Sequence, residues 1–258
     1  LLAAGSLYRA GADKVVFVSQ GALDGGSPLL RLPRDKATVI YNPIVDQELL
    51  DAAKAPVDHP WVAAERDRPV ILGVGRLTKQ KGFAYLLRAF SRLRRGLPSR
   101  LVLVGDGEQR ERLSQLVEQL GVEDDVALFG FRDNPCKFMA RCDVFVLPSL
   151  WEGFGVVLVE AMACGAPVVA TRCPSGPEEV VTDGIDGLLV PPADADALAE
   201  AILTLLKDPA LAQQMSAAGR RRAQEFSAEK SARQYEHLFK TVLARRRPEM
   251  PSRIQASG

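Results

Sequence analysis

Short β-branched runs alternate with longer amphipathic stretches from Asp13 to the middle of the 220s, a pattern typical of parallel βαβ units. The apolar density of the short runs predicts burial on both faces of a sheet. The pattern therefore predicts an α/β fold with a doubly wound parallel sheet and helices on both faces. The predicted strands cover residues 14–19, 38–41, 70–74, 101–104, 126–129, 144–147, 168–170 and 188–190.

The layout breaks once, after Asn42, where a proline-containing stretch of mixed charge begins. Residues 44–69 are therefore predicted to be an interdomain linker. Two strands are too few for an independent sheet with a two-sided core, so residues 1–43 are predicted to be the end of a domain that begins upstream of Leu1. Residues 70–224 are predicted to form one complete doubly wound domain.

Beyond Asp194 the pattern turns helical, and Asp194, Asp208 and Ser227 are predicted to cap three helices. The last of these, within residues 225–247, carries a single apolar stripe. Residues 248–258 are predicted to be a disordered tail.

Composition narrows the class of protein. Lys and Arg number 33 against 32 Asp and Glu, so no overall field favours nucleic acid or an anionic membrane surface. No run approaches the ~18 apolar residues of a transmembrane helix, and no secretory leader opens the chain. A soluble cytoplasmic protein is expected, with peripheral contact at the inner face of the membrane left open.

The cysteines show no CxxC pair, and the sequence has only 2 histidines to complete a metal site. A structural zinc is therefore not expected. Scattered thiols in apolar segments are typical of small core residues in a reducing compartment. The four cysteines are Cys136, Cys142, Cys164 and Cys173.

The stretch 73–82 places glycines and cations between a predicted strand and a predicted helix. Ligands of parallel α/β sheets lie outside the carboxyl ends of strands, where Arg76 and Lys81 would face an anion such as a pyrophosphate. The alternative is a tight turn with solvated cations. The glycines do not follow the GxGxxG dinucleotide pattern, which argues against a dehydrogenase.

A similar turn, residues 105–108, follows the next strand but carries Asp106 and Glu108. These carboxylates would repel an anion, so they are predicted to cap the following helix. The alternative is a rim position in the same cleft.

Residues 148–165 hold two glutamates, Glu152 and Glu160, around a glycine-flanked turn and an apolar helix. On one continuous helix they would lie roughly 12 Å apart along the axis, which suits two hydroxyl-rich parts of an elongated ligand. The amides of 153–155 suit a phosphate. The alternative makes Glu152 a helix N-terminal charge and pairs Glu160 with a cation.

Three motifs in this order resemble retaining glycosyltransferase family 4, also called group 1: residues 75–82, residues 152–160 and residues 173–190. The resemblance covers nearly the whole chain. It implies a GT-B fold of two Rossmann-like domains facing a cleft, of which this chain would hold the C-terminal donor domain. Residues 12–19 are similar to the last strand of the acceptor domain, and residues 227–245 to the helix that crosses back onto it.

The resemblance implies that Arg76, Lys81 and Glu152 are the catalytic residues. Arg76 and Lys81 would bind the donor diphosphate, Glu152 the sugar hydroxyls and Glu160 the ribose. Arg132, in the loop 130–133, would lie against the base. The donor-binding set is Gly75, Arg76, Lys81, Arg132, Glu152, Gly153, Phe154, Gly155, Val156 and Glu160.

The implied reaction transfers a hexosyl or N-acetylhexosaminyl group with retention, from a nucleotide sugar that is expected to be UDP-linked. Neither a cofactor nor an obligate metal is implied, because Arg76 and Lys81 would supply the positive charge. The acceptor, a saccharide or a lipid-linked molecule, would bind the missing domain. Three other readings stay open: a glycoside hydrolase using Glu152 and Glu160, a nucleotide-sugar epimerase or phosphorylase, and a non-catalytic binding module.

Overall fold

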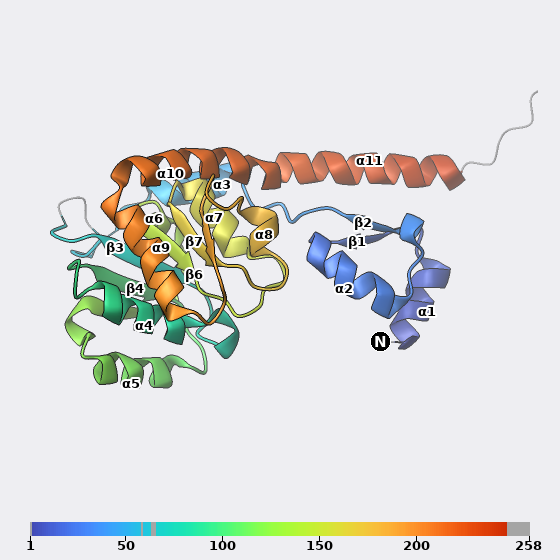
Figure 1. Ribbon diagram of the computed structural model, residues 1–258. Coiled ribbons are helices and arrows are strands. Elements are labelled where there is room, and N and C mark those ends of the chain that lie inside the picture. The colour runs from blue at the N-terminus through green and yellow to red at the C-terminus, as the bar shows by residue number, and fades with distance from the viewer. Residues whose placement is uncertain (1, 58, 63–65, 247–258) are drawn as a thin grey trace, which may run out of the picture.

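The computed structural model describes residues 2–57, 59–62 and 66–246, which form a large and a small lobe (Figure 1). The small lobe contains α1, α2, β1 and β2, and the long helix α11 extends from the large lobe along the small one. The strands are β1 (Val15–Phe17), β2 (Ala37–Val39), β3 (Val70–Val74), β4 (Arg100–Val104), β5 (Val126–Gly130), β6 (Val144–Leu147), β7 (Val168–Thr171) and β8 (Leu188–Val190). The helices are α1 (Leu2–Gly11), α2 (Gln20–Leu30), α3 (Gln47–Lys54), α4 (Phe83–Leu93), α5 (Arg110–Leu120), α6 (Cys136–Met139), α7 (Val156–Cys164), α8 (Pro177–Val180), α9 (Ala195–Lys207), α10 (Pro209–Ala223) and α11 (Ala228–Arg246).

Every predicted strand is present, within two residues at each end. In the large lobe six strands pair in the order β5-β4-β3-β6-β7-β8, and every pairing is parallel. The chain enters at β3 in the middle, builds one half of the sheet and then returns to build the other half from β6. The predicted doubly wound α/β fold is confirmed.

Alternate residues of each strand face opposite sides of this sheet. Val70 and Leu72 belong to the core beneath α3, α6 and α7, whereas Ile71 belongs to the core beneath α4, α5 and α9. Helices therefore cover both faces, as the apolar strands predict (Figure 1).

The predicted linker, residues 44–69, contains a helix that the sequence pattern did not indicate. Asp46 caps α3 by accepting a hydrogen bond from the Leu49 amide at 2.8 Å. Ala53 and Val62 are buried in the core of the large lobe. The prolines that suggested a linker lie after α3, yet Val62 lies among them, so both α3 and the segment after it pack against the large lobe.

The helix caps predicted beyond residue 190 are confirmed. Asp194 accepts from two amides of α9 at 3.0 Å, and Asp208 accepts from the Leu211 amide at 3.0 Å. Ser227 accepts from the Lys230 amide at 3.4 Å. The predicted tail, residues 248–258, lies outside the described residues.

The prediction that Asp106 and Glu108 cap the next helix is wrong. The Asp106 carboxylate accepts from the Gly107 amide at 2.8 Å, inside the turn itself. Helix α5 begins after Gln109, and no side chain caps it. The two carboxylates stand too early in the chain to reach the first amides of that helix.

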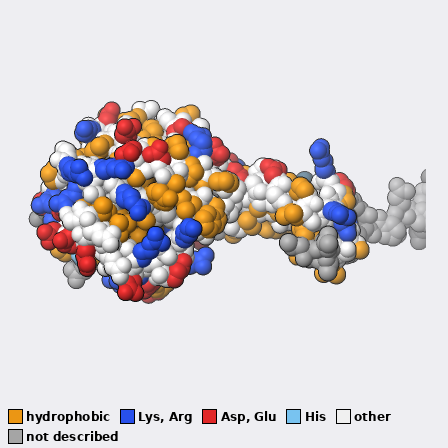
Figure 2. Space-filling view, turned by 60° about the horizontal axis from the view of Figure 1, so that its bottom comes forward, with side chains coloured by type: hydrophobic (Ala, Val, Ile, Leu, Met, Phe, Trp, Pro, Cys, Tyr) orange, Lys and Arg blue, Asp and Glu red, His pale blue; other side chains and the backbone are white. Residues whose placement is uncertain are grey.

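The cysteines and the surface charges are distributed as the composition predicts. All four cysteines are free, and Cys136, Cys142 and Cys173 are buried. Figure 2 shows charged side chains of both signs interspersed over the large lobe, and a narrow junction between the lobes. Among the described residues, no helix has the length and apolar character needed to cross a membrane.

Candidate functional site

A cleft of about 450 Å³ opens where the chain reverses its direction along the sheet. β3 pairs with β4 on one side and with β6 on the other, so the loops after β3 and β6 diverge there. Such switch points are where open α/β sheets bind ligands. The cleft is lined by Val18, Asn42, Gly75, Arg76, Gln80, Lys81, Glu152, Gly153, Phe154, Gly155, Val156, Val157 and Glu160.

The loop after β3 depends on a glycine where it meets the loop after β6. Gly82 adopts the left-handed conformation with φ +64°, and a Cβ there would lie 2.0 Å from the Pro148 carbonyl oxygen. Only glycine permits this approach. Gly82 thereby holds the end of the cationic turn against the second loop.

That approach brings together two residues that the sequence places 71 positions apart. Lys81 Nζ donates to Glu152 Oε1 at 2.6 Å, and the side chains are only 14% and 7% exposed. The Ser149 hydroxyl donates to the same carboxylate oxygen at 2.6 Å. Glu152 is therefore a buried, paired carboxylate in a turn, and its reading as a helix N-terminal charge is wrong.

Arg76 differs from Lys81 in its surroundings. It is exposed on the rim of the cleft, and no ion pair with it is found among the described residues. Its charge is therefore free to act on an anion that enters the cleft.

Helix α7 points its first amides toward the cleft. It begins after Gly155, which has φ +89°, and no side chain caps it. The first N–H groups of a helix have no partner within the helix, and the dipole favours negative charge there. Because α7 starts at Val156, Glu152 is not helical, and the separation expected for one continuous helix does not apply.

Glu160 lies on α7 and lines the cleft. Across the described ranges it forms neither a hydrogen bond nor an ion pair, so the alternative that pairs it with a cation fails. Burial raises the pKa of its carboxyl. A part-buried acceptor without a donor is available for a hydroxyl-bearing ligand.

The structure does not bring Arg132 into this group. Its side chain is exposed, and the guanidinium carbon lies 5.9 Å from the centre of the Phe129 ring. Phe154 reaches the cleft but packs its ring against Tyr41, 5.3 Å between centroids, and is 4% exposed. Gly153, Gly155 and Val156 line the cleft as predicted.

Sequence reasoning missed four lining residues: Val18, Asn42, Gln80 and Val157. Val18 directly follows β1, and Asn42 follows β2 after two residues. Their positions just after the carboxyl ends of strands could have predicted that they line the cleft. The Gln80 amide donates to the Trp151 carbonyl at 2.9 Å and ties the two loops together.

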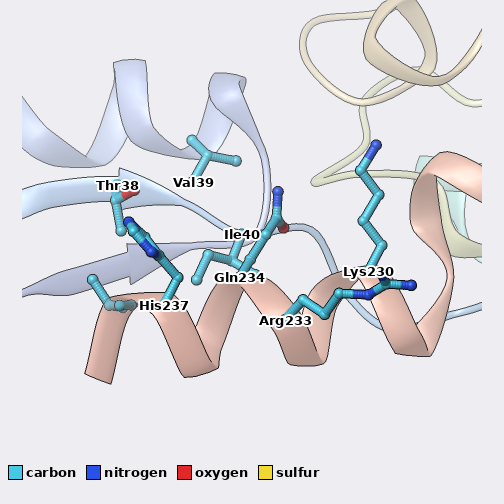
Figure 3. A pocket seen from close by; sticks show the side chains of 8 residues that line it. Thr38, Val39, Ile40, Lys230, Arg233, Gln234 and His237 are labelled. Atoms are coloured by element: carbon cyan, nitrogen blue, oxygen red, sulfur yellow. The ribbon is translucent and has the colours of Figure 1, made fainter. Parts of the chain in front are cut away.

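A second hollow, of about 370 Å³, lies between β2 and α11. Figure 3 shows Thr38, Val39 and Ile40 on one side and Lys230, Arg233, Gln234 and His237 on the other. It contains none of the predicted site residues. Over the described part of the chain, no group of three or more His, Cys, Asp or Glu is placed to hold a metal ion.

Comparison with known proteins gives the family. The family model described as Glycosyl transferases group 1 matches residues 58–222. The chain belongs to this family. The match covers both loops of the cleft and all of α7.

Two relatives illustrate the family. The chain is 34% identical over 228 residues to the N-acetylgalactosamine-N,N'-diacetylbacillosaminyl-diphospho-undecaprenol 4-alpha-N-acetylgalactosaminyltransferase of Campylobacter jejuni, covering 88% of this chain and 60% of that protein. It is 32% identical over 233 residues to the N-acetyl-alpha-D-glucosaminyl L-malate synthase of Bacillus anthracis, covering 90% and 60%. The chain thus spans about three fifths of these relatives' length.

Among solved structures, Anabaena HepE in complex with UDP superposes with a TM-score of 0.81 at 28% identity, covering 92% of this chain and 66% of that one. This member of the group 1 family has the GT-B type of fold, with its parallel sheet flanked by helices and a C-terminal helix.

Proposed function

We propose that this chain carries the donor-binding half of a retaining family 4 glycosyltransferase. It would take a hexosyl or N-acetylhexosaminyl group from a UDP-linked sugar. One observation carries the proposal: a single cleft holds the free cation Arg76, the buried Lys81–Glu152 pair, the open N-terminus of α7 and the unpartnered Glu160. The cations and the helix N-terminus suit the diphosphate of a nucleotide sugar, and the two glutamates suit its hydroxyl groups.

The diphosphate would lie between Arg76, Lys81 and the first amides of α7. An ammonium has three donors, so Lys81 can keep its bond to Glu152 while donating to a phosphate oxygen. Fixed positive charge at this place stabilises the negative charge that develops on the leaving diphosphate. In this proposal the two cations perform the role that a metal ion has in other transferases.

The two glutamates would bind the hydroxyl groups. Glu152 has one oxygen engaged by Lys81 and Ser149, which leaves its second oxygen to accept from a sugar hydroxyl. Glu160, on α7, would accept from the ribose. Arg132 would contact the base only after moving from its position over Phe129.

Retention would follow if the acceptor hydroxyl attacks from the face that the diphosphate leaves. The bond from the anomeric carbon to the phosphate oxygen breaks, the bond to the acceptor oxygen forms, and the acceptor proton passes to the leaving phosphate. No nucleophilic side chain of this chain takes part in that step.

The comparisons support the choice of donor and acceptor classes. HepE has been crystallised with UDP-glucose, and its structure matches this one with a TM-score of 0.77 at 27% identity. The Campylobacter jejuni relative is named for transfer to a diphospho-undecaprenol-linked sugar. We therefore propose a saccharide or lipid-linked acceptor, bound largely by parts outside this chain, and a role in polysaccharide or glycolipid synthesis.

A thermal-shift panel with UDP, GDP, ADP and NAD tests this proposal. A ligand at about 100 times its dissociation constant stabilises by about 2.7 kcal/mol, which raises the melting temperature by several degrees in a chain of this size. We expect stabilisation by UDP, whether or not a chelator is present. Stabilisation by NAD alone, or by no nucleotide in a well-folded sample, would contradict the proposal.

A further inference from the structure

The carboxylate of Glu179 joins the two lobes. Glu179 belongs to α8 of the large lobe, and its oxygens accept from the amides of Gln20 at 2.6 Å and Gly21 at 2.8 Å, at the start of α2 in the small lobe. The Tyr41 hydroxyl also donates to Glu179, at 3.2 Å. One side chain therefore holds both segments by which the small lobe reaches the cleft.

Close backbone contact accompanies these hydrogen bonds. A Cβ added to Gly21 would lie 2.2 Å from the Cβ of Ser175, so only glycine allows the lobes to approach this far. Beside it, the Ser19 hydroxyl donates to the Gly153 carbonyl at 2.9 Å and the Ser175 hydroxyl donates to the Glu152 carbonyl at 2.6 Å. The interface thus rests on the backbone of the cleft's own turn.

The held residues adjoin the cleft residues of the small lobe. Val18 precedes Ser19 in the chain, and Asn42 follows Tyr41; both line the cleft. Release of Glu179 would remove the hydrogen bonds that hold the start of α2 and the Tyr41 hydroxyl, leaving Tyr41 its ring contact with Phe154, and would loosen this wall of the cleft.

We propose that Glu179 is a positioning residue for the donor site: by holding the first turn of α2 and Tyr41, it sets Val18 and Asn42 against the turn at Glu152. This inference rests on the donor-binding function proposed above. Glu179 itself lies outside the cleft lining and acts through the residues that it holds.

Two independent pairs of variants test the inference in the whole chain. Glu179→Gln replaces one carboxylate oxygen with an NH₂ group that cannot accept from an amide, whereas Glu178→Gln changes the neighbouring exposed residue, which pairs with Arg172 at 2.9 Å. Gly21→Ala introduces the clash with Ser175, whereas Gly25→Ala adds a Cβ to the same helix where nothing lies within 4 Å. Neither control touches the junction.

Hydrogen exchange measured by mass spectrometry, without ligand, gives the first readout. Glu179→Gln and Gly21→Ala should both raise exchange in residues 15–24 and 38–44, while α9 and α10 keep theirs and the controls match the unchanged chain. Equal exchange in Glu179→Gln and Glu178→Gln would overturn the inference.

Calorimetry with UDP-glucose gives the second readout. Both junction variants should bind it on the order of fivefold more weakly than their controls, because a mobile wall must be ordered again on binding. Raised exchange with unchanged affinity would overturn the positioning role. Failure of the unchanged chain to bind any nucleotide would count against the proposed function alone, because the exchange comparison needs no ligand.

Discussion

Arg76 and Lys81 carry the same charge and lie five positions apart, but their surroundings differ. Lys81 is buried against Glu152, whereas Arg76 is exposed on the rim of the cleft. We therefore expect Lys81 to contribute to folding as well as to the proposed donor site, and Arg76 to contribute to the proposed site alone.

Lys81→Met should destabilise the chain by about 3 kcal/mol, because it leaves the Glu152 carboxylate buried without its cation. Arg76→Ala should change the free energy of unfolding by less than about 0.5 kcal/mol. Urea denaturation of both variants measures the contrast. Equal destabilisation would mean that the Lys81–Glu152 pair does not form in solution.

Glu160 is a part-buried carboxyl for which the described residues supply no hydrogen-bond donor. Its pKa lies above the ordinary 4.5 because burial disfavours the charged form. A carboxyl with a raised pKa contributes nothing below 4.5, and it lowers stability as the pH rises through the folded pKa.

Glu160→Gln should therefore raise the melting temperature at neutral pH, and the gain should vanish below pH 4.5. Melting curves of the variant and the unchanged chain across this range provide the measurement. A neutral-pH gain that persists in acid would show that the ionisation of Glu160 is not its cause.

At the scale of the elements, the strands were the most predictable part of the fold. Runs such as Val144–Leu147 are apolar on both faces and too short for a buried helix, which favours a strand. Short helices were not predicted: α3 has 8 residues and α8 only 4, too few for the helical period to stand out. The cleft loops were located by their position after strands, whereas the pairing of Lys81 with Glu152 depends on tertiary packing that no local pattern encodes.

The junction of the two cleft loops gives a prediction at this scale. Gly82→Ala should cost more than about 2 kcal/mol, since it combines a left-handed backbone with a clash against the Pro148 carbonyl. Gly184→Ala is the matched control, because Gly184 has φ +76° and nothing within 4 Å of an added Cβ; it should cost about 1 kcal/mol. Equal costs in chemical denaturation would mean that the close approach at Gly82 relaxes freely.

At the scale of the whole molecule, the two lobes meet at the site. The sequence predicted that residues 1–43 belong to a separate structural unit and that the last helix crosses toward it. It gave no sign that Gln20 and Glu179, 159 positions apart, would bind each other. Contacts of this kind depend on how two folded lobes pack together, so neither segment carries a local sequence pattern that predicts them.

Burial of the apolar stripe on α11 also depends on how the two lobes are arranged. The predicted stripe consists of Tyr235, Leu238, Phe239, Val242 and Leu243. Phe239 and Leu243 are 60% and 63% exposed, although an apolar stripe predicts burial. A helix pattern reports which face is apolar and leaves open what covers it. In this structure the small lobe covers only part of that face, around the hollow of Figure 3.

The central claim is that the cleft at the switch point binds the diphosphate of a nucleotide sugar through Arg76. Titration calorimetry with UDP tests it most directly, using the unchanged chain, Arg76→Ala and Lys79→Ala. Lys79 is an exposed cation of the same turn that does not line the cleft, so its removal changes the net charge equally. We predict that Arg76→Ala weakens binding about tenfold or more, as expected for a lost charge-assisted hydrogen bond, and that Lys79→Ala binds like the unchanged chain. Equal affinities in the two variants, or no binding of UDP by the unchanged chain, would contradict the claim.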